Sequence, residues 1–433
     1  MTHPISGRLS RLTIGPAATS PVPLAVRRVP LAARITVLVA GLSVTLLAGH
    51  VGPAAAAGAP ALDVRVNPSL ELSIVASGLQ APRGLAAVSN DRVFVTEFSW
   101  TKGGGRLSRL DRSGSGQWKR TTMFAKLDRP FGITVGPDEK IYVGEAGTVF
   151  RFDPSADAPT REDVIGGSST VARIPSKGLH PLTQVIFLND RSLLAGLGSD
   201  TNNCEKSKGR PTCPSTVGRN SVAVVRRYAM SWPAGKPGSW TIAARGLRNS
   251  MGLAQHSSGT VLQVENGRDD ITKADPTLSD DTLPHDEMNE IDLGAPADHG
   301  WPHCYDNQVP SPEFRGFACR RTKAPLRLLP AHSAPLGLSY WTGASAPAAF
   351  AGSLVVSYHG YRDTGHRLVS FPVDSRGRPS GPAAMLIDDW GEKDLASGES
   401  QNFGGPVGVL PMADGSLFVA DDRNNVVVML RAK

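Results

Sequence analysis

One phrase recurs six times along this chain: a Gly or Pro heads a short apolar run, a polar turn follows, and a second apolar run completes the phrase. The apolar runs are four to six residues long and rich in Val, Ile, Leu and Phe, which is typical of buried β-strands. The turns carry Asn-Asp, Pro-Asp or Asp-Gly, residues that accept hairpin dihedral angles. The heads of the six copies align at Pro82, Pro130, Pro181, Asn249, Pro335 and Pro406.

The spacing between copies indicates the fold class. Heads roughly 50 to 85 residues apart are typical of a propeller or another array of repeated units. Six small sheets around one axis would leave only short, protected edges and would gather their connecting loops on one face. We therefore predict an all-β, six-bladed β-propeller over residues 58–433. Since the repeats run from near Val64 to the last residues, no second domain is expected.

The first 57 residues do not follow the repeat. Three arginines precede an uncharged stretch at 35–49, and alanines follow at 54–57, which is the pattern of an export signal. The stretch is shorter than the roughly 20 residues that span a bilayer, so no stable membrane span is expected after cleavage, although a retained anchor is an alternative. We predict a periplasmic or extracellular protein with residues 1–57 as signal and flexible segment. Arg27-Arg28 suggests twin-arginine export, but Val29-Pro30 departs from that pattern.

The four cysteines fall into two local pairs, Cys204 with Cys213 and Cys304 with Cys319. Two disulfides are the simplest interpretation for an exported protein. The spacing does not match paired CxxC zinc motifs. Four free thiols are the alternative.

The formal charge is +7, with basic residues spread along the chain. No basic run with interleaved aromatic residues indicates a nucleic-acid surface, so no nucleic-acid partner is expected. A positive face would nevertheless help to attract an anionic cofactor or substrate.

The segment between Glu265 and Asp298 is rich in carboxylates. Carboxylate oxygens are ligands that Ca²⁺ prefers, but no spacing here matches an EF-hand loop. A solvated acidic loop would have the same composition, and both interpretations stay open.

A resemblance emerges from six segments taken in order. They are GLRNSMGLA, VENGRDD, LPHDEMNEID, DHGWPHCYD, HSAPLGLSYW and PVGVLPMADGSLFVADD. This ordered set resembles the soluble quinoprotein glucose dehydrogenase and sorbosone dehydrogenase family over about 370 residues, essentially all of the expected mature chain. The resemblance implies a six-bladed propeller that holds pyrroloquinoline quinone and Ca²⁺ on its loop face and oxidises a sugar.

The resemblance also implies roles for individual residues. His180 matches the general base, a role that suits histidine because its ordinary pKa lies near neutral pH; an exposed turn histidine is the alternative. Ser199 stands where a carboxylate would orient that base, so the orienting role is shifted or absent. Arg248 and Asn249 match the pair that contacts the quinone oxygens, although Arg248 could simply pair with a nearby carboxylate.

The metal ligands are also implied by the resemblance. Gly267 and Arg268 match two backbone carbonyls that bind Ca²⁺, and Asp286 matches an acidic position only after a long insertion.

One departure concerns the cofactor's carboxylates. An arginine is expected just before the PVGV strand, where this chain has Gly404-Gly405. Arg362 or Arg367 from the YHGYRDTGHR loop, or Arg83 from the first repeat, is proposed to replace it. His359 and His366 lie in the same YHGYRDTGHR loop and are either ligands or bystanders.

The leading hypothesis is an exported dehydrogenase, dependent on pyrroloquinoline quinone, that oxidises an aldose- or sorbosone-type sugar and passes electrons to an unidentified acceptor. A non-catalytic propeller that binds carbohydrate or protein is a rival, because it accounts for Gly404-Gly405 directly. A metal-dependent lactonase on a propeller scaffold is a third hypothesis. Three clustered arginines or lysines in the cleft would favour the first hypothesis, and carboxylates converging on one central metal would favour the third.

Overall fold

In the computed structural model the described residues are 62, 64–169, 174–176, 178–181, 183–207, 212–218, 220–390 and 404–433. The expected export segment lies outside them. Across these described ranges, no helix is long and apolar enough to cross a membrane.

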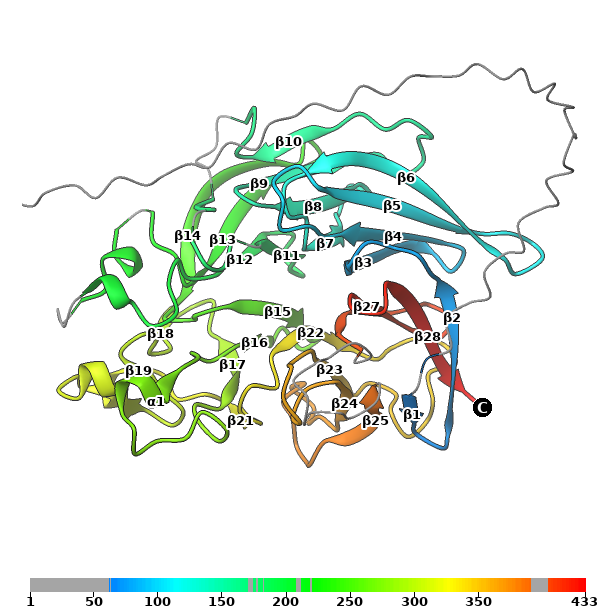
Figure 1. Cartoon of the computed structure of the whole chain (residues 1–433). Coiled ribbons are helices and arrows are strands. Elements are labelled where there is room, and N and C mark those ends of the chain that lie inside the picture. The colour runs from blue at the N-terminus through cyan, green and yellow to red at the C-terminus, as the bar shows by residue number, and fades with distance from the viewer. Residues whose placement is uncertain are drawn as a thin grey trace, which may run out of the picture. The chain divides into compact units, whose positions relative to one another are not determined.

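Six principal sheets follow one another along the described part of the chain (Figure 1). The first sheet comprises β3 (Pro82–Ser89), β4 (Arg92–Glu97), β5 (Gly105–Arg112) and β6 (Trp118–Leu127). The second comprises β7 (Ile133–Val135), β8 (Ile141–Glu145), β9 (Thr148–Phe152) and β10 (Glu162–Ile165). The third comprises β11 (Thr183–Phe187), β12 (Leu193–Leu197), β13 (Val224–Ser231), β14 (Lys236–Arg245) and β18 (Ala297–Asp298). The fourth comprises β15 (Ser250–Gln255), β16 (Val261–Glu265), β17 (Asp286–Ile291) and β21 (Arg327–Leu329). The fifth comprises β22 (Pro335–Tyr340), β23 (Leu354–Tyr358), β24 (Arg367–Phe371), β25 (Ala384–Trp390) and β1 (Val64–Val66). The sixth comprises β26 (Pro406–Pro411), β27 (Leu417–Asp421), β28 (Val426–Ala432) and β2 (Leu70–Ala76).

The sheets are the blades of a propeller. The inner strands β3, β7, β11, β15, β22 and β26 each contact the next, and β26 contacts β3, so the ring is closed. Each predicted repeat head lies within three residues of the start of one inner strand. The predicted all-β, six-bladed fold is therefore confirmed.

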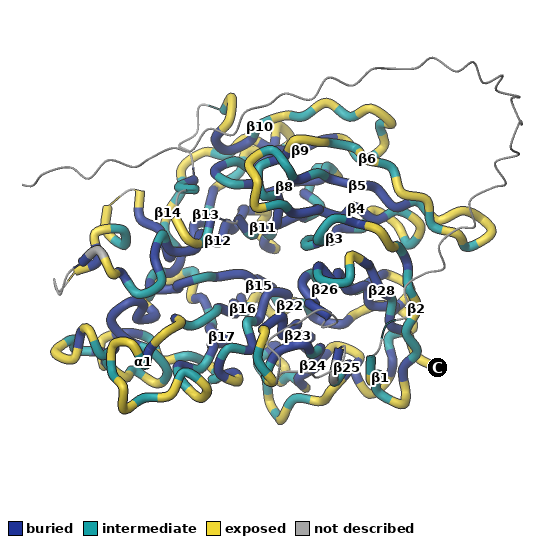
Figure 2. Tube along the Cα trace, in the orientation of Figure 1, coloured by how far each residue is buried: buried dark blue, intermediate teal, exposed yellow. Residues whose placement is uncertain are grey.

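The core consists of apolar layers between successive blades. Phe94 and Leu107 of the first blade pack with Ile141 and Phe150 of the second, and a comparable cluster joins every neighbouring pair around the ring. Burial is greatest in the middle strands, whereas exposed residues gather in the connections (Figure 2). Each fully buried Leu, Ile, Val or Phe contributes about 1.5–3 kcal/mol, so the contacts between blades are a major stabilising term.

The remaining elements belong to long connections beside the third and fourth blades. They are the short helix α1 (Ile271–Ala274), the pair β19 (Cys304–Tyr305) and β20 (Val309–Pro310), and single 3₁₀ turns at Glu205–Ser207, Pro214–Thr216, Pro312–Phe314 and Cys319–Arg321. Two disulfides, Cys204–Cys213 and Cys304–Cys319, constrain these connections. Both predicted pairings are confirmed, and no described cysteine is free.

Candidate active site

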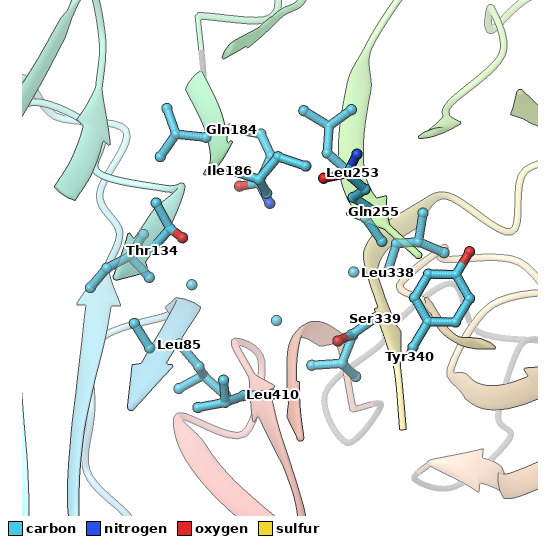
Figure 3. Close-up of a pocket in the computed structure, with 18 of the residues that line it drawn as sticks. Leu85, Thr134, Gln184, Ile186, Leu253, Gln255, Leu338, Ser339, Tyr340 and Leu410 are labelled. Atoms are coloured by element: carbon cyan, nitrogen blue, oxygen red, sulfur yellow. The ribbon is translucent and has the colours of Figure 1, made fainter. Parts of the chain in front are cut away.

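A cavity of about 730 Å³ lies among the inner strands. All six inner strands contribute to its wall (Figure 3). Phe131, Met251, Leu336 and Val407, at or just before the starts of four inner strands, form one buried apolar cluster. Val407 thus has a packing role in this cluster.

The predicted site residues lie at the end of the ring where the inner strands begin, which we call the entry face. Strand pairing brings the ends of the second strands to the same place: Leu197 pairs with Thr183, and Glu265 with Ser250. The loop that precedes the inner strand and the loop that follows the second strand of a blade therefore both lie at the entry face.

His180 immediately precedes β11 and is held by the end of β12. Its Nδ1 lies 2.9 Å from Ser199 Oγ, and Ser199 Oγ donates its single hydrogen to the Thr201 carbonyl at 2.6 Å. Ser199 therefore accepts from the His180 Nδ1–H, and the lone pair of the neutral ring is on Nε2. Burial, followed by the charge of Arg248, lowers the pKa of His180 from 6.5 to about 3. Ser199 thus orients the ring in place of the carboxylate that the family resemblance had suggested.

Arg248 and Asn249 precede β15 and lie beside His180. A Cβ added at Gly198 would come 2.4 Å from His180 Cβ and 3.0 Å from Asn249 Oδ1, which shows how closely the two residues approach. Asn249 Nδ2 donates to Asn266 Oδ1 at 2.9 Å. The absence of a side chain at Gly198 therefore leaves room for both His180 and Asn249 beside it.

The Arg248 guanidinium is buried and largely bonded to the protein. Its Nη2 donates to Asn202 Oδ1 and Asp269 Oδ2, both at 2.8 Å, and its Nε donates to the Asn202 carbonyl at 3.1 Å. A longer bond of 3.4 Å joins Nη1 to the Asn266 carbonyl. One of the five guanidinium hydrogens has no bond among these contacts, so Arg248 would act on a ligand mainly through that hydrogen and its charge.

The Gly267–Arg268 turn follows β16 and is fixed from behind by Asp286. One Asp286 oxygen accepts from Gly267 N at 2.7 Å, and the other accepts from Ala334 N at 2.7 Å and Ser333 Oγ at 3.1 Å. Both oxygens are thus occupied by protein donors. Through these bonds Asp286 positions the turn.

A buried carboxyl pair lies behind the same turn. Glu265 and Glu287 are opposite each other on β16 and β17. Burial raises the pKa of both groups, that of Glu287 to about 8. The pair therefore carries less than two negative charges at neutral pH.

A second charged group lies across the ring, at the start of β3 in the first blade and on the loops after β23 and β27 in the fifth and sixth blades. Asp422 Oδ2 is 2.7 Å from Arg83 Nη2, and Asp422 Oδ1 is 2.9 Å from His359 Nε2. Arg423 Nη2 donates to the His359 carbonyl at 2.7 Å. Burial raises the pKa of Asp422, but the interactions with His359, Arg83 and Arg423 outweigh burial and bring that pKa to about 2. We call Arg83, His359, Asp422 and Arg423 the cation cluster.

The cation cluster accounts for the glycines at 404 and 405. A Cβ at Gly405 would lie 2.4 Å from Asp422 Oδ1 and 2.9 Å from both His359 Nε2 and Arg423 Cγ. Arg423 Nη1 also reaches the Gly404 carbonyl at 3.2 Å. Arg423, arriving from the loop after β27, therefore fills the space that a side chain at 405 would need.

Arg362 and Arg367 are not brought to this group. Arg362 Nη1 contacts the Asp280 carbonyl and Asp281 Oδ1, both at 2.6 Å, and its side chain is 42% exposed. Arg367 Nε contacts Asp388 Oδ1 at 3.1 Å. His366 Nδ1 lies 2.9 Å from the Gly404 carbonyl and 2.8 Å from Arg423 Nη1, at the edge of the cation cluster.

No group of three or more His, Cys, Asp or Glu side chains suited to a metal ion occurs among the described residues. A calcium site in this region would therefore depend on oxygens of another kind. The backbone carbonyls of the Gly267–Arg268 turn are of that kind.

A family model described as TrAA12-like matches residues 64–433, which include every strand of the propeller. The chain belongs to the TrAA12-like family. This membership confirms the resemblance to quinoprotein sugar dehydrogenases that the sequence motifs indicated.

Among curated relatives, the chain is 22% identical over 431 residues to a pyrroloquinoline quinone-dependent pyranose dehydrogenase of Coprinopsis cinerea, covering 86% of this chain and 55% of that protein. It is 27% identical over 193 residues to an uncharacterized protein of Borreliella burgdorferi, covering 43% of this chain and 47% of that protein. The chain thus spans about half the length of the curated relatives it matches.

Solved structures share the fold of this TrAA12-like chain. A Trichoderma reesei enzyme of Carbohydrate-Active Enzymes family AA12 has a TM-score of 0.69 at 20% identity, covering 86% of this chain and 98% of that one. The holo pyrroloquinoline quinone domain of the Coprinopsis cinerea pyranose dehydrogenase has a TM-score of 0.66 at 18% identity, with the same coverage. A quinone-bound aldose sugar dehydrogenase of Streptomyces coelicolor has a TM-score of 0.56 at 17% identity, covering 85% and 100%.

Several residues of the TrAA12-like site were missed in the sequence. Asn202, Asn266 and Arg423 hold the site together. Asn202 and Arg423 lie outside the six motif segments, and Asn266 lies within VENGRDD but was assigned no role. A positional signal was available, because the second strand of each repeat ends in polar residues at Glu97, Glu145, Ser199-Asp200, Glu265-Asn266, His359 and Asp421-Asp422. These positions meet at the entry face.

Proposed function

We propose that this chain is an exported sugar dehydrogenase that depends on pyrroloquinoline quinone and Ca²⁺. The observation that carries the proposal is the meeting of His180, Arg248 and Asn249 at the entry face, with His180 held neutral and its lone pair on Nε2. Bound quinone would supply the acceptor for the hydride that leaves the sugar carbon.

His180 would remove the proton from the sugar hydroxyl. Its Nε2 is the basic atom of the tautomer that Ser199 selects, so the ring accepts a proton without first losing one. Protonated His180 would lie beside the positive charge of Arg248, and this repulsion disfavours the protonated ring. An anionic cofactor nearby would offset that repulsion, because an opposite charge favours the protonated ring.

Arg248 and Asn249 would bind the quinone oxygens. Arg248 has one uncommitted guanidinium hydrogen among the contacts above, and Asn249 Nδ2 retains one hydrogen beyond its bond to Asn266. Two donors on adjacent residues suit a planar acceptor whose negative charge increases on reduction.

The cation cluster would hold the cofactor's carboxylates. Arg83 and Arg423 each have a buried Nε that lacks a hydrogen-bond partner within the described part of the chain. These two arginines replace Arg362 and Arg367 in the proposal, because the latter pair with Asp281 and Asp388. Asp422 offsets part of the positive charge, so binding would rely on directed hydrogen bonds as well as on net charge.

Calcium would be held by the Gly267 and Arg268 carbonyls together with the cofactor. The Asp286 carboxylate stiffens the turn through Gly267 N. Turn geometry rather than side-chain identity would then determine metal binding.

Export and the electron acceptor complete the proposal. Two disulfides are the covalent feature expected of a protein that matures in an oxidising compartment. The acceptor would take electrons from the reduced cofactor at the entry face and is identified only by that requirement.

Reconstitution tests the proposal. Purified protein is mixed with pyrroloquinoline quinone and Ca²⁺, and the absorption spectrum is followed before and after adding aldoses and an artificial electron acceptor. We expect a bound-quinone spectrum that changes on sugar addition. If quinone never binds, the non-catalytic carbohydrate- or protein-binding propeller replaces this proposal. No observation on the described residues favours the lactonase hypothesis.

A further inference from the structure

A cleft of about 550 Å³ opens beside the proposed site, in the connections next to the third and fourth blades. Its walls come from three segments: the 202–207 loop, the 268–274 segment that includes α1, and the 3₁₀ turn Pro312–Phe314. Its volume lies within the range of roughly 300–1,000 Å³ that is typical of ligand pockets. Nothing in the proposed function uses this cleft.

The walls are fixed to one another by specific contacts. Arg268 Nη1 donates to both oxygens of Glu313 at 2.8 and 2.6 Å, and Asn203 Nδ2 donates to Glu313 Oε1 at 2.5 Å. Glu313 therefore joins all three segments. A further ion pair between Arg315 and Asp275 ties the 3₁₀ turn to the segment after α1.

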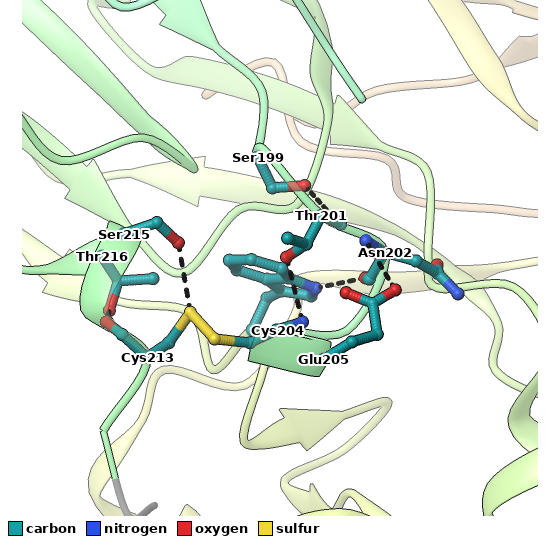
Figure 4. The surroundings of a disulfide bond; sticks show 9 residues. Ser199, Thr201, Asn202, Cys204, Glu205, Cys213, Ser215 and Thr216 are labelled. Atoms are coloured by element: carbon teal, nitrogen blue, oxygen red, sulfur yellow. Dashed lines mark hydrogen bonds between the residues drawn. A yellow bond between two sulfur atoms is a disulfide. The ribbon is translucent and has the colours of Figure 1, made fainter. Parts of the chain in front are cut away.

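The disulfides support the same walls. Cys204 lines the cleft and is bonded to Cys213, while Glu313 and Phe314 lie within the loop closed by Cys304 and Cys319. Thr201 Oγ1 accepts from Cys204 N at 3.0 Å, which anchors the first wall to the segment that orients His180 (Figure 4). The cleft is thus preorganised rather than a gap between loose loops.

Asn202 connects the cleft to the proposed site. Its Oδ1 accepts from Arg248 Nη2 at 2.8 Å and from Asp269 N at 2.9 Å, and its Nδ2 donates to the Asp269 carbonyl at 2.8 Å. Asn202 also lines the cleft. A ligand in the cleft would therefore lie one residue away from Arg248.

The lining indicates the chemistry of the ligand. Two cations, Arg268 and Lys273, face three carboxylates, Glu205, Asp270 and Glu313, so an anionic ligand would meet net negative charge. Asn203 adds an amide whose Oδ1 is buried without a hydrogen-bond partner among the described residues. Several donors and acceptors around a weakly negative cleft suit an uncharged molecule with several hydroxyl groups.

We propose that this cleft binds the second sugar unit of an oligosaccharide whose terminal unit lies at His180. The inference rests on the proposed function for the position of the terminal unit. The cleft would make the protein prefer a disaccharide or longer chain to a free monosaccharide. The ligand is a neutral glycan, and a free oligosaccharide and the end of a polysaccharide would present the same chemistry to the cleft.

Binding to the cofactor-free protein is the first test, because it does not depend on catalysis. Calorimetric titrations compare glucose with cellotriose, maltotriose and xylotriose at one pH and salt concentration. We expect at least one trisaccharide to bind about tenfold more tightly than glucose, the scale of one hydrogen bond to a charged group. Equal affinity for glucose and all three trisaccharides would overturn the inference.

A blocking variant tests the location. Ala274 is exposed and lines the cleft, so Ala274→Trp fills the cleft without disturbing the core. Glu313→Gln is a second variant, which removes the carboxylate that joins the walls. Asp157→Asn is the matched control, because its side chain is 95% exposed and lies far in the sequence from every segment of the cleft. We expect both cleft variants, and not the control, to reduce the trisaccharide-to-glucose affinity ratio toward one. An unchanged ratio in well-folded Ala274→Trp would place the second sugar unit elsewhere.

Kinetics separate this inference from the proposed function. If the reconstituted enzyme oxidises sugars but its KM for trisaccharides equals that for glucose, the cleft inference fails and the proposed function stands. If quinone never binds while trisaccharides still bind through the cleft, the proposed function fails and the cleft inference stands as a carbohydrate site.

Discussion

At the residue scale, the clearest chemical assignment concerns His180. Ser199 fixes its tautomer through a hydroxyl whose only hydrogen is already donated to Thr201. A hydroxyl acceptor orients the ring without adding the negative charge that a carboxylate would bring. The ring therefore keeps a low proton affinity until an anionic group lies nearby.

His180→Ala tests the base in the reconstituted enzyme. We expect turnover to fall on the order of 10²-fold or more, the usual scale for loss of a general base. Quinone binding, followed by absorption, should change little because the donors Arg248 and Asn249 are retained. Ser199→Ala is the companion variant, and it should lower turnover less because it disturbs only the tautomer. Equal sugar oxidation with and without His180 would remove it from the mechanism.

The depressed pKa of His180 also makes a prediction about stability. The group titrates near 3 in the folded cofactor-free protein, because of burial and then Arg248, against 6.5 when unperturbed. Between these values the unfolded chain binds the extra proton, so the contribution of His180 to stability is complete above about pH 6.5 and is lost as the pH falls toward 3.

Urea unfolding of the cofactor-free protein at several pH values measures this effect. We expect the free energy of unfolding to decline less steeply in His180→Gln than in the original protein as the pH falls from 6.5 toward 4. Identical slopes would show that His180 titrates normally in the folded state.

At the element scale, the glycine within the repeated phrase has a packing reason. A Cβ at Gly84 would lie 2.2 Å from the Phe131 carbonyl oxygen, one at Gly337 would lie 2.0 Å from that of Val407, and one at Gly408 would lie 2.3 Å from that of Arg83. In each case the neighbour belongs to the start of the next blade. The inner strands approach so closely near the axis that only hydrogen fits.

Gly337→Ala tests this close approach. We expect the free energy of unfolding to fall by about 1–3 kcal/mol or more, as for other overpacked positions. Gly114→Ala is the control, because a Cβ there meets nothing within 4 Å and no positive φ is required. Chemical denaturation of both variants measures the difference, and equal stabilities would contradict the tight inner ring.

The inner strands were also the elements that the sequence predicted best. Their heads could be found because each carries the same local pattern of turn residue, glycine and apolar run. Asn202 and Arg423 could not be found in this way, since their partners Arg248 and His359 lie 46 and 64 positions away. Such contacts arise only when blades close into a ring, and a pattern within one repeat carries no trace of them. The ion pairs of Arg362 and Arg367 with Asp281 and Asp388 could not be predicted for the same reason: a loop position does not reveal which carboxylate a long side chain reaches.

At the scale of the whole molecule, closure of the ring determines whether the entry face exists. The last blade combines β26, β27 and β28 with β2 from the other end of the chain, paired from Leu70 with Ala432 to Ala76 with Val427. Leu70 and Val75 are buried in the clusters on either side of that blade. The cation cluster depends on this arrangement, because Asp422 and Arg423 come from the sixth blade and Arg83 from the first.

Removing β2 therefore tests the link between closure and function. A chain that begins at Gly78 lacks both β1 and β2, whereas a chain that begins at Gly58 keeps them and is the control. We expect the shorter chain to expose the unpaired edge of β28 and to aggregate or unfold at lower denaturant concentration. Quinone binding should weaken with it, because the partners of Arg83 are no longer held in register. Size-exclusion chromatography, denaturation and quinone titration measure these effects. If the shorter chain stays monomeric, equally stable and equally able to bind quinone, the cation cluster does not depend on closure by β2.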